Sequence, residues 1–419
     1  MTTERHVVLT FVRFGDALHV LGSPDATWTG LRPLGSFTPD WDGVDAASLT
    51  VRHLVEHAAD AGEFSVAAVE ELRRTGTWLF DELLPRGARQ WLRDDEGLLT
   101  LHLDPALLHI PWELLHTSRE FVSVRWALGR VVAADADTSI QRPLDGARRS
   151  ALVIADPAEH LVEAFNEGQI LRDVLVEHDE VAVDLRATCV DADLLRRHVR
   201  DYDILHFAGH IDREGWQMDA SRFDASHLDR LAGGAPLPAL VFANGCGATA
   251  PGGPDDDMVL RWLRGGVRHL LGPLFDVPDR LGRAFAVRFY ESLLAGAPIG
   301  IAVRDARRLL AEEVGLGTVP WGAYVLYGTP DTVYRPAETV RTVALPEPEP
   351  RPTRLSPDGA PVDAEAVRRG GVAVAAALPD RRRTLAGWTP LELLVLALIA
   401  GIAAAVWFGL RFEPSFGSF

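Results

Sequence analysis

The pattern of apolar and polar positions divides residues 1 to about 335 into alternating strands and helices. Short runs of strand length, such as A-L-V-I-A-D-P and D-I-L-H-F-A-G, are nearly continuous in hydrophobicity. Between them lie segments whose apolar residues recur three and four positions apart, which is typical of amphipathic helices. Continuous apolar strands that alternate with helices predict an α/β fold, with a mostly parallel sheet covered by helices on both faces.

The individual elements can be placed in chain order. Two strand-like runs in residues 6–22 are separated by Gly15-Asp16, a hairpin signal. Helical spacing covers residues 45–61 and 64–84, and Pro85 ends the second helix. From Leu98 onward, strands are expected at L-L-T-L-H-L, A-L-V-I-A-D-P, V-A-V-D-L-R, D-I-L-H-F-A-G, L-V-F-A-N-G, V-R-H-L-L-G-P-L-F and W-G-A-Y-V-L-Y-G, and helices at residues 162–177, 191–200, 280–295 and 299–314.

Composition narrows the class of protein. A chain of 419 residues with 47% hydrophobic content can bury a large core in two or three domains. Its formal charge of −17 argues against a nucleic-acid partner, because phosphate binding requires a basic surface. Two cysteines, Cys189 and Cys246, suit neither a disulfide framework nor a zinc site and indicate a reducing compartment.

The last part of the chain has a different pattern. Residues 336–387 are rich in proline, as in L-P-E-P-E-P-R-P, and predict an extended linker. The uninterrupted apolar run from Leu393 to Leu410 reaches the lower limit for a membrane span. We therefore expect one transmembrane helix at residues 388–411, followed by a short external tail at 412–419. A core helix or an oligomer-packing helix is the alternative.

Charge on either side of this run predicts its orientation. Arg381, Arg382 and Arg383 precede it, whereas Arg411 alone follows it closely. Positively charged flanks stay on the cytoplasmic side. We therefore expect a single-pass, tail-anchored membrane protein whose folded part is cytoplasmic.

Two of the expected strands are followed by residues that suit nucleophilic catalysis. D-I-L-H-F-A-G leads to His210, and L-V-F-A-N-G leads to Cys246. If the two strands are neighbours, both side chains lie at the carboxyl edge of the sheet, where ligands bind. An imidazole increases the thiolate fraction of a nearby thiol or takes its proton during attack. Gly245 and Gly247 permit close approach of a carbonyl to main-chain N–H groups, which suits an oxyanion hole.

Seven motifs occur in order along the chain: I-P-W-E-L-L-H at Ile110, A-L-V-I-A-D-P at Ala151, D-I-L-H-F-A-G-H at Asp203, P-A-L-V-F-A-N-G-C at Pro238, F-Y-E-S-L-L-A-G at Phe289, A-V-R-D-A-R-R at Ala302 and W-G-A-Y-V-L-Y-G-T-P at Trp321. Together they make the region from about Leu98 to Tyr334 resemble the CHAT domain, a caspase-like cysteine peptidase family. The resemblance implies a caspase-hemoglobinase-like three-layer sandwich without cofactor or metal. It also implies that His210 is the base and Cys246 the nucleophile. We place an N-terminal α+β region at residues 1–95 and the peptidase-like domain at 96–335.

Two departures from the family pattern keep a second functional class open. The family usually has glycine where this chain has Ile211, and often an acid-Ser-Gly segment where it has Gly247-Ala248-Thr249. Ile211 retains its N–H, so it remains an oxyanion candidate with Gly245 and Gly247. The first class is a membrane-anchored cysteine endopeptidase that cleaves a specific protein, with a role in bacterial stress or antiphage defence that resemblance suggests. The second is a non-catalytic, membrane-tethered adaptor, and a regulatory protein partner fits either class.

Specificity can be predicted only by resemblance. Arginine-specific relatives of the caspases place one acid at the end of the first sheet strand and another two residues before the cysteine. This chain has Asp156 at the first position and Asn244 at the second. We hypothesise a preference for a basic residue before the scissile bond. Alternatively, Asp156 starts a turn before Pro157.

Three further residues have a structural interpretation. His206, inside its strand, is expected to be a core histidine bonded to the backbone. Glu113 is expected to be a buried acid that accepts hydrogen bonds from loop N–H groups, because an uncompensated carboxylate would be costly there. Cys189 lies in a strand-to-helix connection. The pattern leaves open whether residues 1–95 form a separate domain or complete the peptidase sheet.

Overall fold

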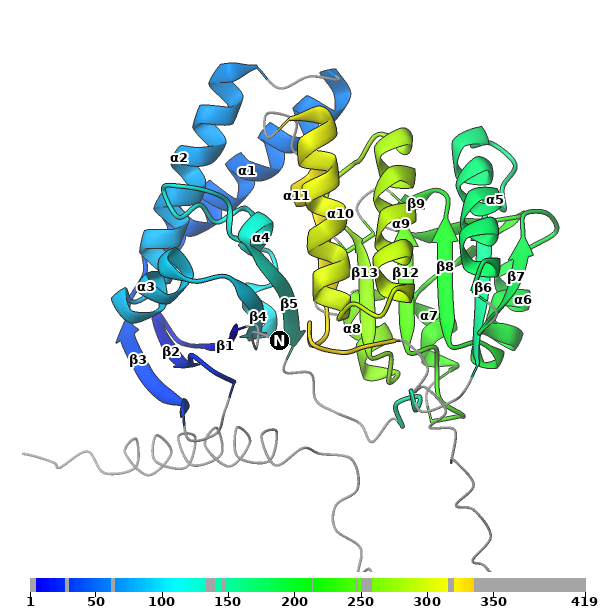
Figure 1. Ribbon diagram of the computed structural model, residues 1–419, viewed down its shortest axis with the longest axis horizontal. Helices are drawn as coiled ribbons and strands as arrows, with labels where there is room; N and C mark the ends of the chain where they lie inside the picture. Colours follow the sequence, from blue (N-terminus) through cyan, green and yellow to red (C-terminus); the bar gives the residue numbers. More distant parts are fainter. Residues whose placement is uncertain are drawn as a thin grey trace, which may run out of the picture. The chain divides into compact units, whose positions relative to one another are not determined.

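An 11-stranded sheet runs through the folded part of the chain, in the order β3-β2-β1-β4-β5-β14-β13-β12-β8-β6-β7. The computed structural model describes residues 5–26, 30–61, 65–132, 140–144, 148–178, 180–212, 214–231, 233–245, 248–249, 258–315 and 320–334. All of these belong to a unit that spans Met1–Ala337. Most strand pairs are parallel, which confirms the α/β class (Figure 1).

The strands and helices have the following bounds. The strands of the large sheet are β1 Arg5–Phe14, β2 Ala17–Ser23, β3 Arg32–Phe37, β4 Gly97–Leu103, β5 Trp126–Val132, β6 Arg149–Ala155, β7 Val181–Arg186, β8 Ile204–Ala208, β12 Leu240–Asn244, β13 His269–Pro273 and β14 Tyr324–Tyr327. A small sheet contains β9 Ile211–Asp212, β10 Gly215–Met218 and β11 Ser221–Phe223. The α-helices are α1 Trp41–Ala61, α2 Val66–Leu83, α3 Arg86–Asp94, α4 Val122–Arg125, α5 Val162–Val176, α6 Ala192–His198, α7 Ala225–Asp229, α8 Met258–Arg264, α9 Asp279–Leu294, α10 Ile299–Val314 and α11 Pro320–Ala323.

The N-terminal strands belong to the same sheet as the strands after residue 95, which answers the question that the pattern left open. β1 pairs in parallel with β4, and β1 and β2 form the expected hairpin. Gly15 has φ 57° in the turn, a left-handed conformation that glycine adopts without strain. The boundary at residue 95 therefore does not interrupt the hydrogen bonding of the sheet.

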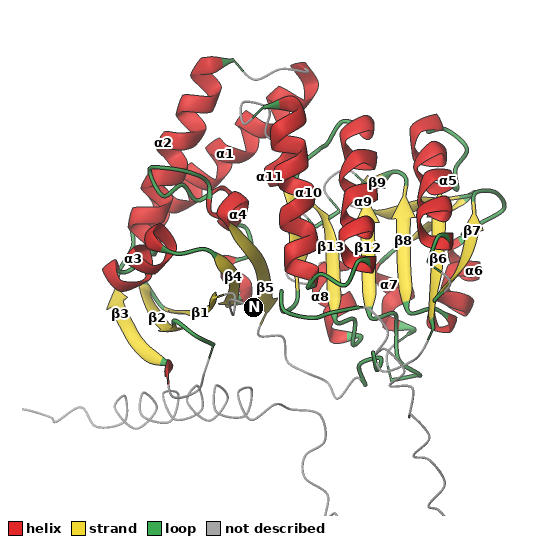
Figure 2. Cartoon of the chain, in the orientation of Figure 1, coloured by secondary structure: helices red, strands yellow, loops and turns green. Residues whose placement is uncertain are grey.

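Helices cover both faces of the C-terminal half of the sheet (Figure 2). On the face seen in the figure, α5 packs beside α9, and α9 beside α10. α6, α7 and α8 lie behind the sheet in this view, as right-handed crossovers that run in both directions along a parallel sheet require. The helix pair α1 and α2 belongs to the N-terminal part, and the side chain of Ser65 caps α2 by accepting from the N–H of Ala68 at 3.1 Å.

Strand β14 joins the two halves of the sheet. It pairs antiparallel with β13 and, through Tyr327 opposite Arg130, parallel with β5. The N–H of Gly328 also donates to the carbonyl of Arg130 at 2.7 Å. The last strand of the described chain therefore lies in the middle of the sheet.

A buried ion pair ties the I-P-W-E-L-L-H motif to this central strand region. Glu113 is 1% exposed and Arg130, in β5, is fully buried. Arg130 donates from Nε to Glu113 at 3.0 Å and from Nη2 to the second carboxylate oxygen. Glu113 is buried, as expected, but its partner is an arginine rather than the loop N–H groups that we expected. The sequence gives no local sign of this pairing, because the two residues lie on different elements.

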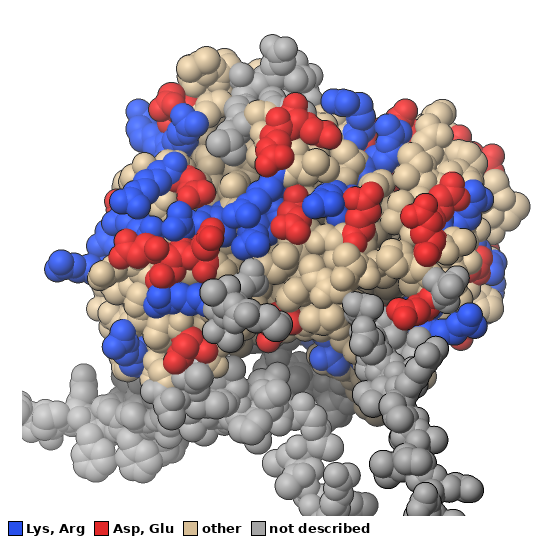
Figure 3. Space-filling view, in the orientation of Figure 1, with Lys and Arg blue, Asp and Glu red and all other residues tan. Residues whose placement is uncertain are grey.

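None of the helices in the described part of the chain combines the length and the apolar character needed to cross a bilayer. The predicted membrane helix at residues 388–411 and the linker before it lie beyond these residues. On the face of the folded part shown in Figure 3, acidic and basic side chains alternate. Surface ion pairs of the folded part include Arg89 with Asp81 at 2.8 Å.

Candidate active site

Strands β8 and β12 are direct neighbours, as catalysis by a Cys/His pair would require. They pair in parallel, and Asn244 at the end of β12 lies opposite Ala208 at the end of β8. His210 follows Ala208 by two positions, and Cys246 follows Asn244 by two positions. Positions 210 and 246 therefore each lie two residues beyond a pair of opposite residues at the same edge of the sheet. Cys246 lies outside the described residues, so its contact with His210 stays a prediction.

Glycines allow the two strand ends to approach each other closely. A Cβ atom added to Gly245 would lie 2.4 Å from the carbonyl oxygen of Gly209 and 2.7 Å from Cγ1 of Ile211. No side chain fits there, because real Cβ atoms essentially never come so close to other atoms. Two of the predicted oxyanion residues, Gly245 and Ile211, are thus in contact, while Gly247 is not among the described residues.

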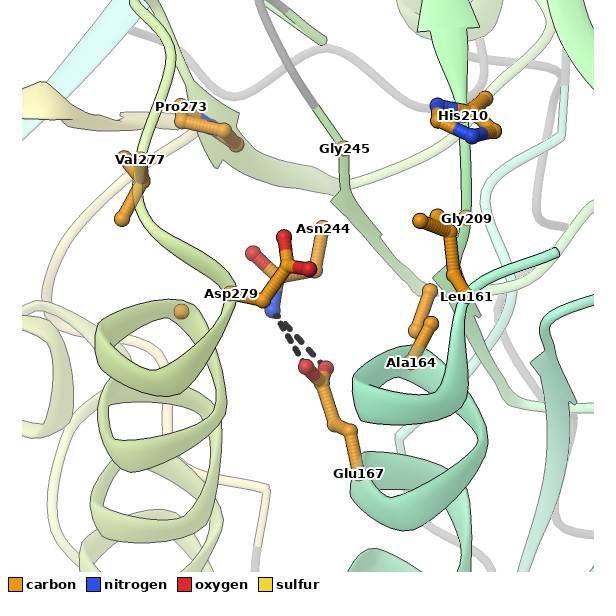
Figure 4. Close-up of a pocket in the computed structure, with 12 residues that line it drawn as sticks. Leu161, Ala164, Glu167, Gly209, His210, Asn244, Gly245, Pro273, Val277 and Asp279 are labelled. Atoms are coloured by element: carbon orange, nitrogen blue, oxygen red, sulfur yellow. Dashed lines mark hydrogen bonds between the residues drawn. The ribbon is translucent and has the colours of Figure 1, made fainter. Parts of the chain in front are cut away.

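A cavity of about 80 Å³ opens beside His210. The strand ends contribute Ala208, Gly209, His210, Asn244 and Gly245, the first two turns of α5 contribute Ala164 and Glu167, and the first turn of α9 contributes Asp279 and Gly282 (Figure 4). The imidazole of His210 is exposed to solvent, and its main-chain carbonyl accepts from the N–H of Gln217 at 2.9 Å. The cavity therefore lies where a substrate side chain would enter next to the predicted base.

Asn244 is fixed at both ends of its carboxamide. Its Nδ2 donates to the two carboxylate oxygens of Glu167 at 2.8 and 2.9 Å (Figure 4). Its Oδ1 accepts from the hydroxyl of Tyr324 at 2.7 Å. The ring of Tyr324 in turn stacks on Phe285, with centroids 3.5 Å apart. Asn244 thus lines the cavity, but its polar atoms are already engaged.

Room for the cavity depends on Gly282 in α9. A Cβ atom at this position would lie 3.3 Å from both Nδ2 of Asn244 and the hydroxyl of Tyr324. This distance is tighter than ordinary van der Waals contact. A side chain at Gly282 would therefore crowd Asn244 and Tyr324 at this side of the cavity.

His206 is a core residue with side-chain partners. It is fully buried in β8, as expected, but it bonds to side chains rather than to the backbone. Its Nε2 lies 2.8 Å from Glu167, and its Nδ1 lies 3.3 Å from the hydroxyl of Tyr290. Glu167 is 4% exposed, so these two side chains form a polar group beneath the cavity.

The second acid of the cavity, Asp279, is the first residue of α9 and is more exposed than Glu167. Burial raises the pKa of the Asp279 carboxyl, the negative charges of Glu167 and Glu163 raise it further, and His210 acts in the opposite direction. Glu163 is itself paired with Arg283. Among the described residues that line the cavity, none is an arginine. The cavity is therefore acidic and lacks a basic side chain other than His210.

Asp156, the first specificity candidate, lies in the turn that follows β6. It follows β6 with φ 51°, its N–H donates to the carbonyl of Ala208 at 2.8 Å, and its Oδ1 accepts from the N–H of His160 at 2.9 Å. Its carbonyl accepts from the N–H of Glu159. These bonds are those of a turn, as the alternative interpretation held, and Asp156 is not among the residues that line the cavity. Asn244, the other specificity candidate, does line it.

Sequence reasoning missed both acids of the cavity. Glu167 lies in an amphipathic helix, where a glutamate is usually a solvent-facing residue, and Asp279 resembles an ordinary N-terminal helix residue. Only the packing of α5 and α9 over the strand ends brings them beside His210. The other cysteine, Cys189, is exposed in the connection from β7 to α6, with φ 55°.

Comparison with solved structures shows the fold. The chain is similar to separase in the Saccharomyces cerevisiae separase-securin complex, with a TM-score of 0.52 and 10% identity over 77% of this chain. It spans 30% of the separase chain. A weaker likeness, to the Arg-specific cysteine proteinase gingipain R, has a TM-score of 0.42 and 11% identity over 70% of this chain and 75% of the other. That score is too low to carry an argument.

Comparison by sequence shows the family. No curated protein matches the chain. The model of the CHAT domain matches residues 73–329, which is more than half of the chain and includes every described residue of the cavity. The chain therefore belongs to the CHAT domain family.

Proposed function

We propose that this protein is a cysteine endopeptidase in which Cys246 is the nucleophile and His210 the base. The observation that carries the proposal is the register of β8 and β12, which sets the two residues equally far beyond a paired position. The acidic cavity beside His210 gives a substrate side chain a place to bind. Membership of the CHAT family supports a peptidase-like fold.

The proposed reaction has two steps. The Cys246 thiolate attacks the peptide carbonyl carbon, and N–H groups near Ile211, Gly245 and Gly247 stabilise the oxyanion. The C–N bond breaks as His210 gives its proton to the leaving amine. Water, deprotonated by His210, then attacks the thioester, releases the acyl group as a carboxylic acid and restores the thiolate beside the protonated His210.

The cellular setting is part of the same proposal. A linker at residues 336–387 and a membrane helix at 388–411 would hold the peptidase at the inner face of a membrane, close to a protein substrate near the bilayer. The pattern of apolar and basic residues in the sequence supports this placement. The role in bacterial stress or antiphage defence rests on family resemblance.

Thiol labelling tests the proposed nucleophile. With the full-length chain in detergent at pH 7, we expect iodoacetamide to alkylate Cys246 about tenfold faster than Cys189, because a neighbouring imidazole increases its thiolate fraction. Cys246→Ala is expected to lose the fast phase and Cys189→Ala to keep it, as peptide mapping of the labelled chain would show. Equal labelling of both thiols at the rate of free cysteine would instead support the adaptor.

We also propose that Asp279 selects a basic residue before the scissile bond. Its carboxylate lines the cavity near two other acids and has no basic partner other than His210 among the groups that shift its pKa. An incoming guanidinium would relieve this repulsion. Asp279 thus takes the role that the sequence had suggested for Asp156.

A matched substrate pair tests this selection. Wild-type protein is expected to cleave an arginine peptide about tenfold more efficiently than the neutral citrulline analogue, the effect of one charged hydrogen bond. Asp279→Asn should abolish the preference mainly through KM, whereas Asp276→Asn, an exposed neighbour outside the cavity lining, should keep it. Lowering the pH should weaken the preference as Asp279 becomes protonated. Arginine and lysine peptides cleaved no better than leucine or aspartate peptides would refute it.

A further inference from the structure

Glu167 contacts both strands that carry the proposed catalytic residues. In β12 its partner is Asn244, two positions before Cys246, and in β8 its partner is His206, four positions before His210. Glu167 itself projects from α5, which packs on β6, β7 and β8, and reaches Asn244 at the end of β12 (Figure 4). One carboxylate thus links side chains of two adjacent strands just below the edge where the reaction would occur.

Burial of the Glu167 carboxylate lowers the stability of the fold unless other groups compensate for it. A carboxylate removed from water loses its hydration, and only hydrogen bonds or an opposite charge can compensate. In the described part of the chain, Glu167 accepts from the amide of Asn244 and from the imidazole of His206 and has no arginine partner. Three hydrogen bonds from these donors hold the carboxylate in place.

The orientation of Asn244 follows from this arrangement. Its Nδ2 must point toward the acceptor Glu167, and its Oδ1 toward the donor Tyr324. The carboxamide therefore cannot turn over without placing its Oδ1 against the carboxylate of Glu167, which would set two acceptors against each other. This fixes the last residue of β12 relative to β8.

We propose that Glu167 is a positioning residue that holds the ends of β8 and β12 in register, so that Cys246 and His210 meet. The inference rests on the proposed peptidase function and adds a residue that acts through Asn244 and His206 rather than on the substrate. A change at Glu167 should therefore lower kcat, and with the neutral citrulline substrate, whose binding does not depend on the charge in the cavity, it should leave KM nearly unchanged. Asp279, in contrast, should act on KM.

An exchange of the two polar groups tests the inference. Asn244→Asp places two carboxylates against each other and is expected to lower kcat about a hundredfold, the effect of a small misplacement of catalytic groups. Glu167→Gln replaces one of the two acceptor oxygens by an NH2 donor that faces Nδ2 of Asn244, and it should lower kcat as well. The double variant Glu167→Gln/Asn244→Asp restores one donor facing one acceptor, so its kcat should return to within about fivefold of wild type, as in a compensating double-mutant cycle.

The pH profile gives a second readout that loss of packing alone would not produce. In Asn244→Asp, a proton shared by the two carboxyl groups would remove their repulsion. The deficit of this variant relative to wild type should therefore shrink as the pH is lowered. Glu177→Gln, at the exposed C-terminal end of the same helix, is the matched control and should behave as wild type.

Three results would overturn the inference: single variants with wild-type kcat, an effect on KM alone, or a double variant no better than the weaker single variant. If Glu167→Gln does not fold, as judged by circular dichroism, Tyr324→Phe removes only the hydroxyl bonded to Asn244 and should still lower kcat. The proposed function fails separately, if wild type and Cys246→Ala have equal activity. An active wild type with an inactive exchange variant would refute the role of Glu167 alone.

Discussion

Replacing His210 by alanine is expected to lower kcat/KM for peptide hydrolysis about a thousandfold, within the range of general acid–base catalysis. The loss follows because no other imidazole lines the cavity in the described part of the chain. Alkylation of Cys246 in this variant should follow the titration of an ordinary thiol, with a pKa near 8.5. In the wild type, alkylation should persist at lower pH, because the imidazolium stabilises the thiolate. Stopped-flow hydrolysis and alkylation rates measured from pH 5 to 9 would show both effects.

The matched control for this prediction is His53→Ala. His53 lies on α1 with a side chain that is 70% exposed, and its substitution should leave both rates unchanged. If His210→Ala retained wild-type hydrolysis, another group would have to take the proton. The pairing of β8 with β12 would then no longer support His210 as the catalytic base.

Replacing Glu113 by glutamine is expected to destabilise the protein by about 4 kcal/mol, the cost of breaking a buried ion pair. Burial alone would lower the pKa of Arg130, but the charge and hydrogen bonds of Glu113 outweigh it and leave the pKa raised. Arg307 is also fully buried, and burial lowers its pKa to about 10, with Glu113 opposing the change and Arg130 adding to it. Without the carboxylate, two arginines would remain buried, and Glu113 is the one carboxyl group among the described residues that shift the pKa of either. Urea unfolding of both proteins would measure the difference in the free energy of unfolding.

Glu120→Gln provides the comparison. Glu120 pairs with Arg125 at 2.7 Å near the surface, where an ion pair contributes about 1 kcal/mol or less. The two variants make the same chemical change a few residues apart. A similar decrease in the free energy of unfolding in both variants would show that the buried Glu113–Arg130 pair stabilises the protein no more than the surface pair does.

Most elements of the C-terminal half could be predicted because each carries its own pattern. The helices α9 and α10 begin and end within a residue or two of the expected positions, and β8 and β12 are apolar except for His206 and Asn244. β5 was missed, because Gly129 and the charged Arg130 interrupt its apolar run. Burial of Arg130 depends on its ion pair with Glu113, and the sequence does not show that these two residues are in contact.

Other features depend on contacts between distant segments. The strands of the small sheet, such as β9 with two residues, are too short to display an alternation of apolar and polar positions. The insertion of β14 between β13 and β5 is a matter of strand order, which no local pattern encodes. The same holds for Glu167, whose role emerges only where α5 meets Asn244 and His206.

The central place of β14 has a consequence for biosynthesis. Five strands, from β3 to β5, lie on one side of it, and five, from β13 to β7, on the other. Both groups leave the ribosome before the strand that joins them, and until then each presents an open edge. A nascent chain therefore cannot assemble the whole sheet until translation has passed Tyr327. If translation stops earlier, the released chain carries two parts of the sheet that no strand joins, and their open edges make it prone to aggregate.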